Sequence, residues 1–302
     1  MNVNDSKFTR KVSDFISNKV RCRGDLYLPS DSKNPPVVIM AHGFGAERTF
    51  GLPAYAEHFA HNGFAVYLFD YRCFGDSDGE PRNYVSAKRH LQDWEAAIAH
   101  VRSLPNIQTE KIALWGSSFS GGHVIVTAAR DGAVSAIIAQ VPHVDAITTI
   151  RMLGIRYFLE ASYHGLRDLF RIITFRSPYY VKIISNPEEF ACLNTPECFP
   201  GYSALIPEDS NWQNRCPARI TLTFGWYRPL TSAGKVACPA LIMAAEKDTL
   251  IDPKSVELTA SKMPNSTVVK YPFGHFDLYR GDAFNDAVKK QTAFLKEHLD
   301  KQ

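Results

Sequence analysis

The sequence has little of what marks a nucleic-acid-binding or membrane protein. Its net charge is only +3 over 302 residues, which gives no reason to expect nucleic acid as a partner. No run approaches the roughly 18 apolar residues of a membrane span. Residues 1–11 are polar and lack the apolar stretch of a signal peptide. We therefore expect a cytoplasmic protein without stable membrane insertion.

Metal and nucleotide motifs are also missing. Neither HxH, HExxH nor CxxC occurs, and Gly43 and Gly45 lack the third glycine of a dinucleotide-binding loop. We therefore expect no metal and no cofactor. The cysteines are six, at 22, 73, 192, 198, 216 and 238. Free thiols are the expectation for this composition, with a disulfide among the neighbouring Cys192, Cys198 and Cys216 as the alternative.

What the sequence does contain is a regular alternation of buried strands and amphipathic helices. Two paired strands are predicted first, over 11–16 and 20–28. Strands are then predicted over 37–41, 64–69, 112–115, 134–141, 239–245 and 267–271, and the apolar runs at 37–41, 64–69 and 239–245 are typical of strands buried on both faces. Helical periodicity is found over 54–61, 86–102, 123–129, 255–263 and a final segment after Asp282, its predicted N-cap. This alternation is typical of an α/β fold with a mostly parallel, doubly wound sheet.

The alternation stops between residues 142 and 235, which divides the chain into a core (1–141 and 236–302) and an inserted segment. Helix patterns near 146–160 and 164–174 are followed by an irregular stretch, and arginines and aromatics are frequent between 151 and 180. We expect a lid that packs its apolar face over an active site and leaves arginine at the rim. A membrane-facing amphipathic surface is the alternative.

A serine-rich turn between a strand and a helix is the strongest chemical signal. Residues 116–120, Gly-Ser-Ser-Phe-Ser, match the nucleophile-elbow pattern G-x-S-x-G except at the last position. Because the strand ends at Trp115, this register puts Ser118 at the apex and Ser120 in the first helical turn. Ser118 is the predicted nucleophile, and Ser120 is the alternative. Ser117 is interpreted as a small residue before the apex. Ser120 in place of glycine is tolerable if Gly121 and Gly122 let the helix approach the strand.

A serine nucleophile needs a base and a group that orients the base. His275 follows the strand 267–271 and Asp248 follows the strand 239–245, so both are expected at the carboxyl edge of the sheet. Glu246 is too close to the strand end to compete with Asp248. Asp252 precedes a proline and is interpreted as a helix N-cap. Asp277, beside the histidine, is expected at the surface or in a supporting role.

The loop after the strand 37–41 supplies candidates for the oxyanion hole. Gly43 and Gly45 allow close approach of the backbone, and we expect the backbone N–H groups of Phe44 and Phe119 to stabilise the oxyanion. His42 in the same loop is expected to be structural, with proton transfer as the alternative. For His143 and His164, packing is the first interpretation and substrate contact the second. His123 is expected to pack against the sheet or to bond locally.

With these residues in place, the chain resembles the α/β-hydrolase-fold serine hydrolases from end to end. The order Ser118, Asp248, His275 is that of the family's nucleophile, acid and histidine. Residues 70–79 are similar to the family's D-x-R-G-x-G-x-S loop, although Cys73 occupies a usual glycine position. Residues 115–123 and 274–279 resemble a branch of thiohydrolases and polyketide transferases, which release or transfer acyl chains from carrier thioesters.

The resemblance implies a serine hydrolase that cleaves a small-molecule acyl ester or thioester through an acyl-enzyme. Three alternatives stay open. The same triad could transfer the acyl group to another acceptor, or the chain could be a proline-directed peptidase. A receptor that keeps the pocket without turnover is the non-enzymatic alternative. The oligomeric state is also open, and an oligomer is possible.

Overall fold

An eight-stranded, mostly parallel sheet organises the chain in the computed structural model, which describes residues 7–299. The strand order is β1-β4-β6-β5-β7-β8-β12-β13, and only the two pairings made by β4 are antiparallel. The strands are β1 Phe8–Val12, β4 Gly24–Pro29, β5 Pro36–Ala41, β6 Ala65–Phe69, β7 Gln108–Ser117, β8 Ala136–Gln140, β12 Ala240–Ala245 and β13 Ser266–Tyr271. This is the α/β architecture that the alternation predicts.

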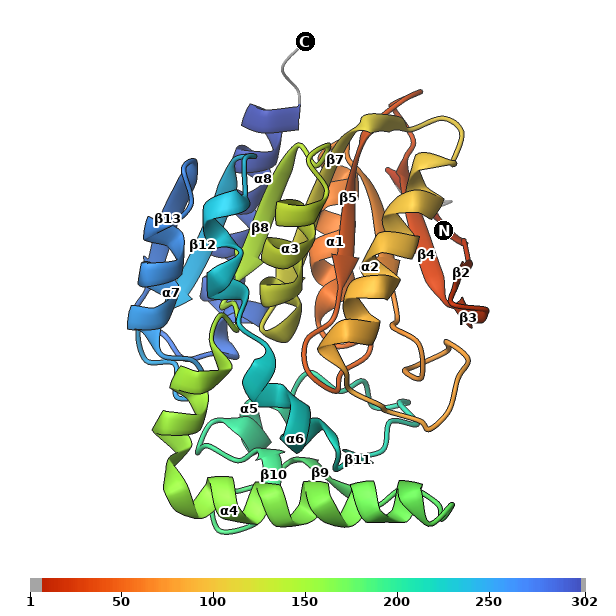
Figure 1. Cartoon of the computed structure of the whole chain (residues 1–302). Helices are drawn as coiled ribbons and strands as arrows, with labels where there is room; N and C mark the ends of the chain where they lie inside the picture. Colours follow the sequence, from red (N-terminus) through yellow and green to blue (C-terminus); the bar gives the residue numbers. More distant parts are fainter. Residues whose placement is uncertain (1–6, 300–302) are drawn as a thin grey trace.

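Helices cover both faces of the sheet (Figure 1). On one face lie α2 Ala87–Arg102, α3 Phe119–Arg130 and α7 Pro253–Ser261; on the other lie α1 Leu52–His61 and α8 Gly281–Leu299. Successive side chains of a strand point to opposite faces, so Val37 and Ile39 of β5 join one core while Val38 and Met40 join the other. A strand buried on both sides explains the continuous apolar runs of the sequence.

The N-terminal region differs from its prediction, because four short strands replace two long ones. β2 Phe15–Ser17 and β3 Val20–Cys22 form a hairpin of their own. Its turn, with Asn18 and Lys19 at φ 47° and 68°, lies in the gap between the two predicted strands. The ladder is interrupted at Ser13, whose carbonyl accepts the Tyr67 hydroxyl at 2.6 Å.

The ends of two helices test two predicted caps. Asp252 accepts the N–H groups of Lys254 and Ser255 and is the N-cap of α7, as predicted. Asp282 is not the N-cap of α8. The helix begins one residue earlier, at Gly281, and Asp282 lies in its first turn, where a carboxylate still complements the helix dipole.

The segment 142–235, here called the insertion, adds no strand to the large sheet (Figure 1). It contains α4 Ala146–Ile173, β9 Tyr180–Ile184, β10 Ala191–Leu193, α5 Cys198–Ser203, β11 Cys216–Pro217, α6 Ile220–Thr223 and the short 3-10 turns η1 Phe224–Trp226, η2 Pro229–Thr231 and η3 Ala233–Lys235. A further turn, η4 Asp277–Tyr279, precedes α8. Instead of two helices separated near residue 162, α4 is one run interrupted at Gly154, whose φ of 81° suits glycine.

Helix α4 has two apolar faces where the sequence predicts one. Leu153 and Tyr157 line a cavity that also includes Ser118, the residue after β7. A second apolar set is exposed along the outside: Met152, Ile155, Leu159, Tyr163, Leu166, Phe170 and Ile173. Within residues 7–299, no helix has both the length and the hydropathy of a membrane-spanning segment. All six cysteines are free thiols, and the Sγ atoms of Cys192 and Cys216 lie 3.6 Å apart.

Candidate active site

Ser118 lies at a sharp turn between β7 and α3. Its φ of 57° and ψ of −121° are strained for a non-glycine residue. This backbone conformation turns the side chain away from the strand. The turn is tight because Gly116 has no side chain: a Cβ there would lie 2.3 Å from the Ser120 carbonyl oxygen. The local geometry is therefore that of a nucleophile elbow.

The three serines of the elbow have different surroundings. Ser117 is buried and accepts the Tyr279 hydroxyl at 2.6 Å. Ser120 is also buried, and its Oγ lies 2.9 Å from the Tyr71 hydroxyl. Ser118 is partly exposed and lines two cavities. Of the three, only Ser118 has its side chain where a substrate could reach it.

Glycines after Ser120 compensate for the missing glycine of the motif. A Cβ on Gly121 would lie 2.8 Å from the Cα of Pro142, and one on Gly122 would lie 2.2 Å from the His143 carbonyl oxygen. Both contacts are with backbone atoms of the segment that follows β8. This backbone could shift to make room only at a large cost in stability. The close approach of helix and strand thus depends on positions 121 and 122, as the sequence predicts.

Asp248 and His275 meet at the carboxyl edge of the sheet. His275 Nδ1 lies 2.6 Å from Asp248 Oδ2, and both residues are buried. The other carboxylate oxygen accepts the N–H groups of Leu250 and Ile251 at 2.8 and 2.9 Å, which fixes the orientation of the carboxylate. This arrangement leaves His275 Nε2 as the ring nitrogen that could accept a proton.

The rival carboxylates are engaged elsewhere. Glu246 is exposed, and Asp252 caps α7. Asp277 is exposed and accepts the Gly274 N–H at 2.9 Å, so it supports the histidine loop from the surface side. Asp248 is the carboxylate that contacts the His275 ring.

The electrostatics of His275 are set by two opposing effects. Burial acts to lower its pKa, and the Asp248 carboxylate outweighs burial, so the pKa lies above the ordinary value. His275 and Ser118 both line a small cavity of about 410 Å³, together with Phe44 and Tyr279. The candidate nucleophile and the candidate base therefore line the same cavity.

The loop after β5 lies directly against the elbow. A Cβ on Gly43 would lie 3.2 Å from Ser118 Cβ, so a side chain there would crowd the elbow. The Phe44 carbonyl accepts the Tyr202 hydroxyl at 3.0 Å, and the Gly45 carbonyl accepts the Trp212 indole N–H at 2.8 Å. The insertion thus holds this loop through its carbonyls. Phe119, the first residue of α3, has an N–H that the helix itself cannot bond.

His42 is buried beneath this loop and is not exposed to either cavity. Its Nδ1 lies 3.0 Å from the Gly43 carbonyl, and Nε2 lies 3.7 Å from Asp70 Oδ1. Burial lowers the pKa of His42 to about 4, so the ring is neutral near pH 7. These contacts support the structural interpretation. Near it, Cys73 adopts a φ of 73°, so cysteine occupies the left-handed conformation that glycine usually provides.

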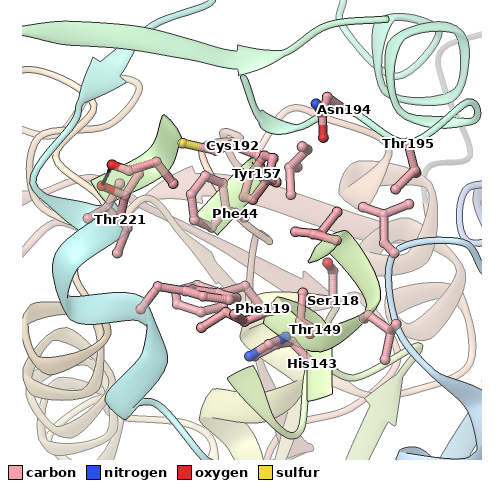
Figure 2. Close-up of a pocket in the computed structure, with 18 of the residues that line it drawn as sticks. Phe44, Ser118, Phe119, His143, Thr149, Tyr157, Cys192, Asn194, Thr195 and Thr221 are labelled. Carbon is pink, nitrogen blue, oxygen red and sulfur yellow. Dashed lines mark hydrogen bonds between the residues drawn. The ribbon is translucent and has the colours of Figure 1, made fainter. Parts of the chain in front are cut away.

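A larger cavity also has Ser118 in its wall (Figure 2). It encloses about 880 Å³ including its open mouth, and its wall is mainly apolar. The insertion supplies Ile150, Leu153, Tyr157 and Ile220, while His143 and Phe119 lie beside Ser118. Neither cavity has an Asp or Glu among the described residues that line it.

Sequence reasoning missed Glu197, which connects both candidate triad loops to the insertion. One carboxylate oxygen accepts the His275 N–H at 2.8 Å. The other accepts the Thr249 N–H at 2.6 Å and the Thr249 hydroxyl at 2.7 Å. A Cβ on Gly274 would lie 2.5 Å from Glu197 Oε2, so the glycine before His275 makes room for the carboxylate. Gly274 is the feature of the sequence that could have indicated a close contact at this loop.

Of the remaining candidate histidines, His164 and His123 line neither cavity. His164 stacks on Phe190 and Tyr179 within the insertion and lines neither cavity. His123 Nδ1 lies 2.5 Å from the Tyr227 hydroxyl, so it bonds to the insertion rather than locally. His143, in contrast, lines the large cavity.

Several known proteins are similar to this chain in sequence or in structure. A family model described as serine aminopeptidase, S33, matches residues 32–274. Quorum-quenching protein AidA of Acinetobacter baumannii is 37% identical over 291 residues, 93% of each chain. Thiohydrolase aneE of Aspergillus aculeatus is 38% identical over 143 residues, 47% of this chain and 44% of that protein. The crystal structure of the α/β hydrolase GrgF from Penicillium sp. sh18 has a TM-score of 0.83 at 25% identity, covering 97% of this chain and 100% of that chain.

Proposed function

Because the chain belongs to the α/β-hydrolase family that the serine aminopeptidase S33 model describes, we propose that it is a serine hydrolase that cleaves an acyl ester or thioester. The observation that carries the proposal is the buried contact between His275 Nδ1 and Asp248, at 2.6 Å, in a site where His275 and Ser118 line one cavity. Residues 142–235 act as the lid of this site.

In the proposed mechanism, Ser118 Oγ attacks the substrate carbonyl while His275 Nε2 takes the hydroxyl proton. Asp248 holds the Nδ1–H tautomer and stabilises the imidazolium that forms. The N–H groups of Phe44 and Phe119 bind the oxyanion of the tetrahedral intermediate, and each such donor contributes about 3–4 kcal/mol. His275 returns the proton to the leaving alcohol or thiol. Water, activated by His275, then hydrolyses the acyl-enzyme.

The walls of the cavities support an acyl substrate over a peptide with a free amino terminus. An aminopeptidase needs a carboxylate or a cluster of acceptors to bind the substrate's ammonium group. The described lining residues of both cavities include no carboxylate. The large cavity, rich in Leu, Ile and aromatic side chains, suits an acyl chain. The relative described as a thiohydrolase makes a thioester the first substrate to assay.

The second cavity supports acyl transfer as the alternative outcome. Its lining includes His275 and Ser118, with Phe50, Tyr202 and Tyr279. An alcohol, thiol or amine bound there could lose its proton to His275 and attack the acyl-enzyme in place of water. Hydrolysis and transfer would then use the same residues and differ only in the acceptor.

The test is a series of p-nitrophenyl esters and N-acetylcysteamine thioesters, from acetyl to dodecanoyl. We expect hydrolysis whose kcat/KM depends on chain length, and its loss in Ser118→Ala. The products are then measured in the presence of an added acceptor alcohol. Free acid indicates hydrolysis, and a new ester of the added alcohol indicates transfer. If wild type and Ser118→Ala have the same rate on every substrate, the proposed function is wrong and a binding role is left.

A further inference from the structure

The outer side of α4 is apolar and exposed, and the proposed lid role does not use it. Leu153 and Tyr157, on the inner side, line the large cavity. The name outer face is used here for seven exposed residues of the helix that line neither cavity: Met152, Ile155, Leu159, Tyr163, Leu166, Phe170 and Ile173. Figure 1 shows the long part of α4 along the lower edge of the molecule, with the rest of the insertion between it and the large sheet. The described part of the chain leaves this face uncovered.

The area of the outer face is unusual for a soluble monomer. Ile155 and Ile173 are 71% and 67% exposed, and Phe175, which follows the helix, is 99% exposed. With Phe175, the outer face exposes on the order of 1,000 Å² of apolar surface, whereas the largest apolar patch of a typical monomer measures about 300–600 Å². A patch of this size marks a surface that binds a membrane or another protein.

Arginines border the outer face. Arg156, Arg167 and Arg171 each follow a residue of the outer face by one position, and since one residue turns the helix by about 100°, they lie along one edge of that face. Arg151 and Arg176 lie near its two ends. Within residues 7–299, none of these five arginines forms an ion pair with a carboxylate.

The acids of the same segment do not balance these arginines. Between residues 151 and 176 the acids are Glu160 and Asp168. Asp168 is buried and paired with Arg219, so Glu160 is the acid left on the exposed side. A surface with this excess of positive charge attracts an anionic partner.

From the apolar face and its arginine edge we propose that the outer face of α4 binds the surface of an anionic lipid bilayer. The helix lies in the plane of the bilayer surface, with its apolar side chains at the level of the headgroups and upper acyl chains and its arginines at the lipid phosphates. A second copy of this chain fits less well. A two-fold interface brings the same surface together twice, so it would add the same arginines and again only Glu160.

The test is flotation of the protein with lipid vesicles. We expect about 10- to 100-fold tighter binding to phosphatidylcholine vesicles that contain about 30% phosphatidylglycerol than to phosphatidylcholine alone. About 0.5 M NaCl should remove most of this difference. Leu159→Asp should lower binding to the anionic vesicles at least about tenfold. Its matched control is Leu258→Asp, in α7, where the leucine is similarly exposed and the added charge is the same; this variant should bind like the wild type.

A second pair of variants tests the arginines. Arg151→Gln with Arg156→Gln should lose most of the preference for anionic vesicles. The control is Lys254→Gln with Lys262→Gln, two exposed lysines of α7 and its C-cap, and it should keep that preference.

These measurements do not use catalytic activity, so their outcome is independent of the proposed function. The inference is wrong if the folded wild-type protein binds neither kind of vesicle, or if Leu159→Asp and Leu258→Asp bind equally. A dimer in sedimentation velocity that Leu159→Asp dissociates, without vesicle binding by the wild type, would assign the outer face to a second copy and overturn the lipid proposal.

Discussion

The Glu197 carboxylate accepts the backbone N–H of His275 at 2.8 Å, so a residue of the insertion holds the loop of the candidate base. The same carboxylate holds Thr249, the neighbour of Asp248, through the Thr249 N–H and hydroxyl. The relative position of acid and base therefore depends on a residue that hydrogen-bonds to neither the Asp248 carboxylate nor the His275 ring.

Substitution of Glu197 should lower turnover more than substrate binding. Glu197→Ala leaves two loop N–H groups without their acceptor, and we expect kcat to fall about 10- to 100-fold with little change in KM. Thermal unfolding should show a loss of about 1–2 kcal/mol. The matched control is Glu208→Gln, an exposed carboxylate of the insertion that lines neither cavity. Equal kinetics in the two variants would show that Glu197 has no positioning role.

The pH dependence should report the ionisation of His275. Protonated His275 cannot accept the Ser118 proton, so kcat/KM should decline as pH falls through its pKa. Asp248 raises that pKa above the ordinary 6.5 despite burial, and the decline should therefore be centred above pH 6.5. In Asp248→Asn the acidic limb should move to lower pH, and the maximal rate should drop by about 10⁴-fold. If the acidic limb of the Asp248→Asn profile stays at the wild-type pH, the limb reports the ionisation of a group other than His275.

Ser120 should matter for stability and not for chemistry. Its Oγ lies 2.9 Å from the Tyr71 hydroxyl in the core, so Ser120→Ala should lose about 1 kcal/mol of unfolding free energy. Its kcat/KM should stay within about threefold of wild type, in contrast to Ser118→Ala. Chemical denaturation and ester hydrolysis measure the two effects. A Ser120→Ala enzyme that is folded and inactive would move the nucleophile to position 120.

The glycines after the elbow should tolerate no side chain. In Gly122→Ala the new Cβ would lie 2.2 Å from the His143 carbonyl oxygen, and we expect a loss of about 3 kcal/mol or more. The control is Gly132→Ala, where a Cβ would meet nothing within 4 Å; its melting temperature should hardly change. Similar melting temperatures for both variants would contradict the tight helix–strand approach that the structure shows.

The parts that could be predicted from sequence are those that follow from periodicity and strand ends. The apolar runs predict the sheet, because strands buried on both faces need them. Ser118, Asp248 and His275 could be named because each follows a predicted strand. The strand before His275, β13, is the exception to burial on both faces, since only Tyr271 of its residues is buried. Cys73 shows the limit: the motif marks it as a departure from the usual glycine, but does not say that the cysteine adopts the left-handed conformation, with a φ of 73°.

The insertion was harder to predict for a physical reason. Its position depends on contacts with the core and not on a repeat of its own. Glu197 lies in an irregular stretch where no pattern assigns it a partner. The outer face of α4 was missed because apolar spacing alone does not say which face is covered.

The central claim is that Ser118 is the nucleophile. Incubation with an alkyl fluorophosphonate, followed by intact-protein and peptide mass spectrometry, tests it most directly. We predict a single adduct on Ser118, lost in Ser118→Ala and strongly slowed in His275→Ala. An adduct on Ser117 or Ser120, or equal labelling of wild type and Ser118→Ala, would contradict the account, as would no adduct on the folded wild-type protein.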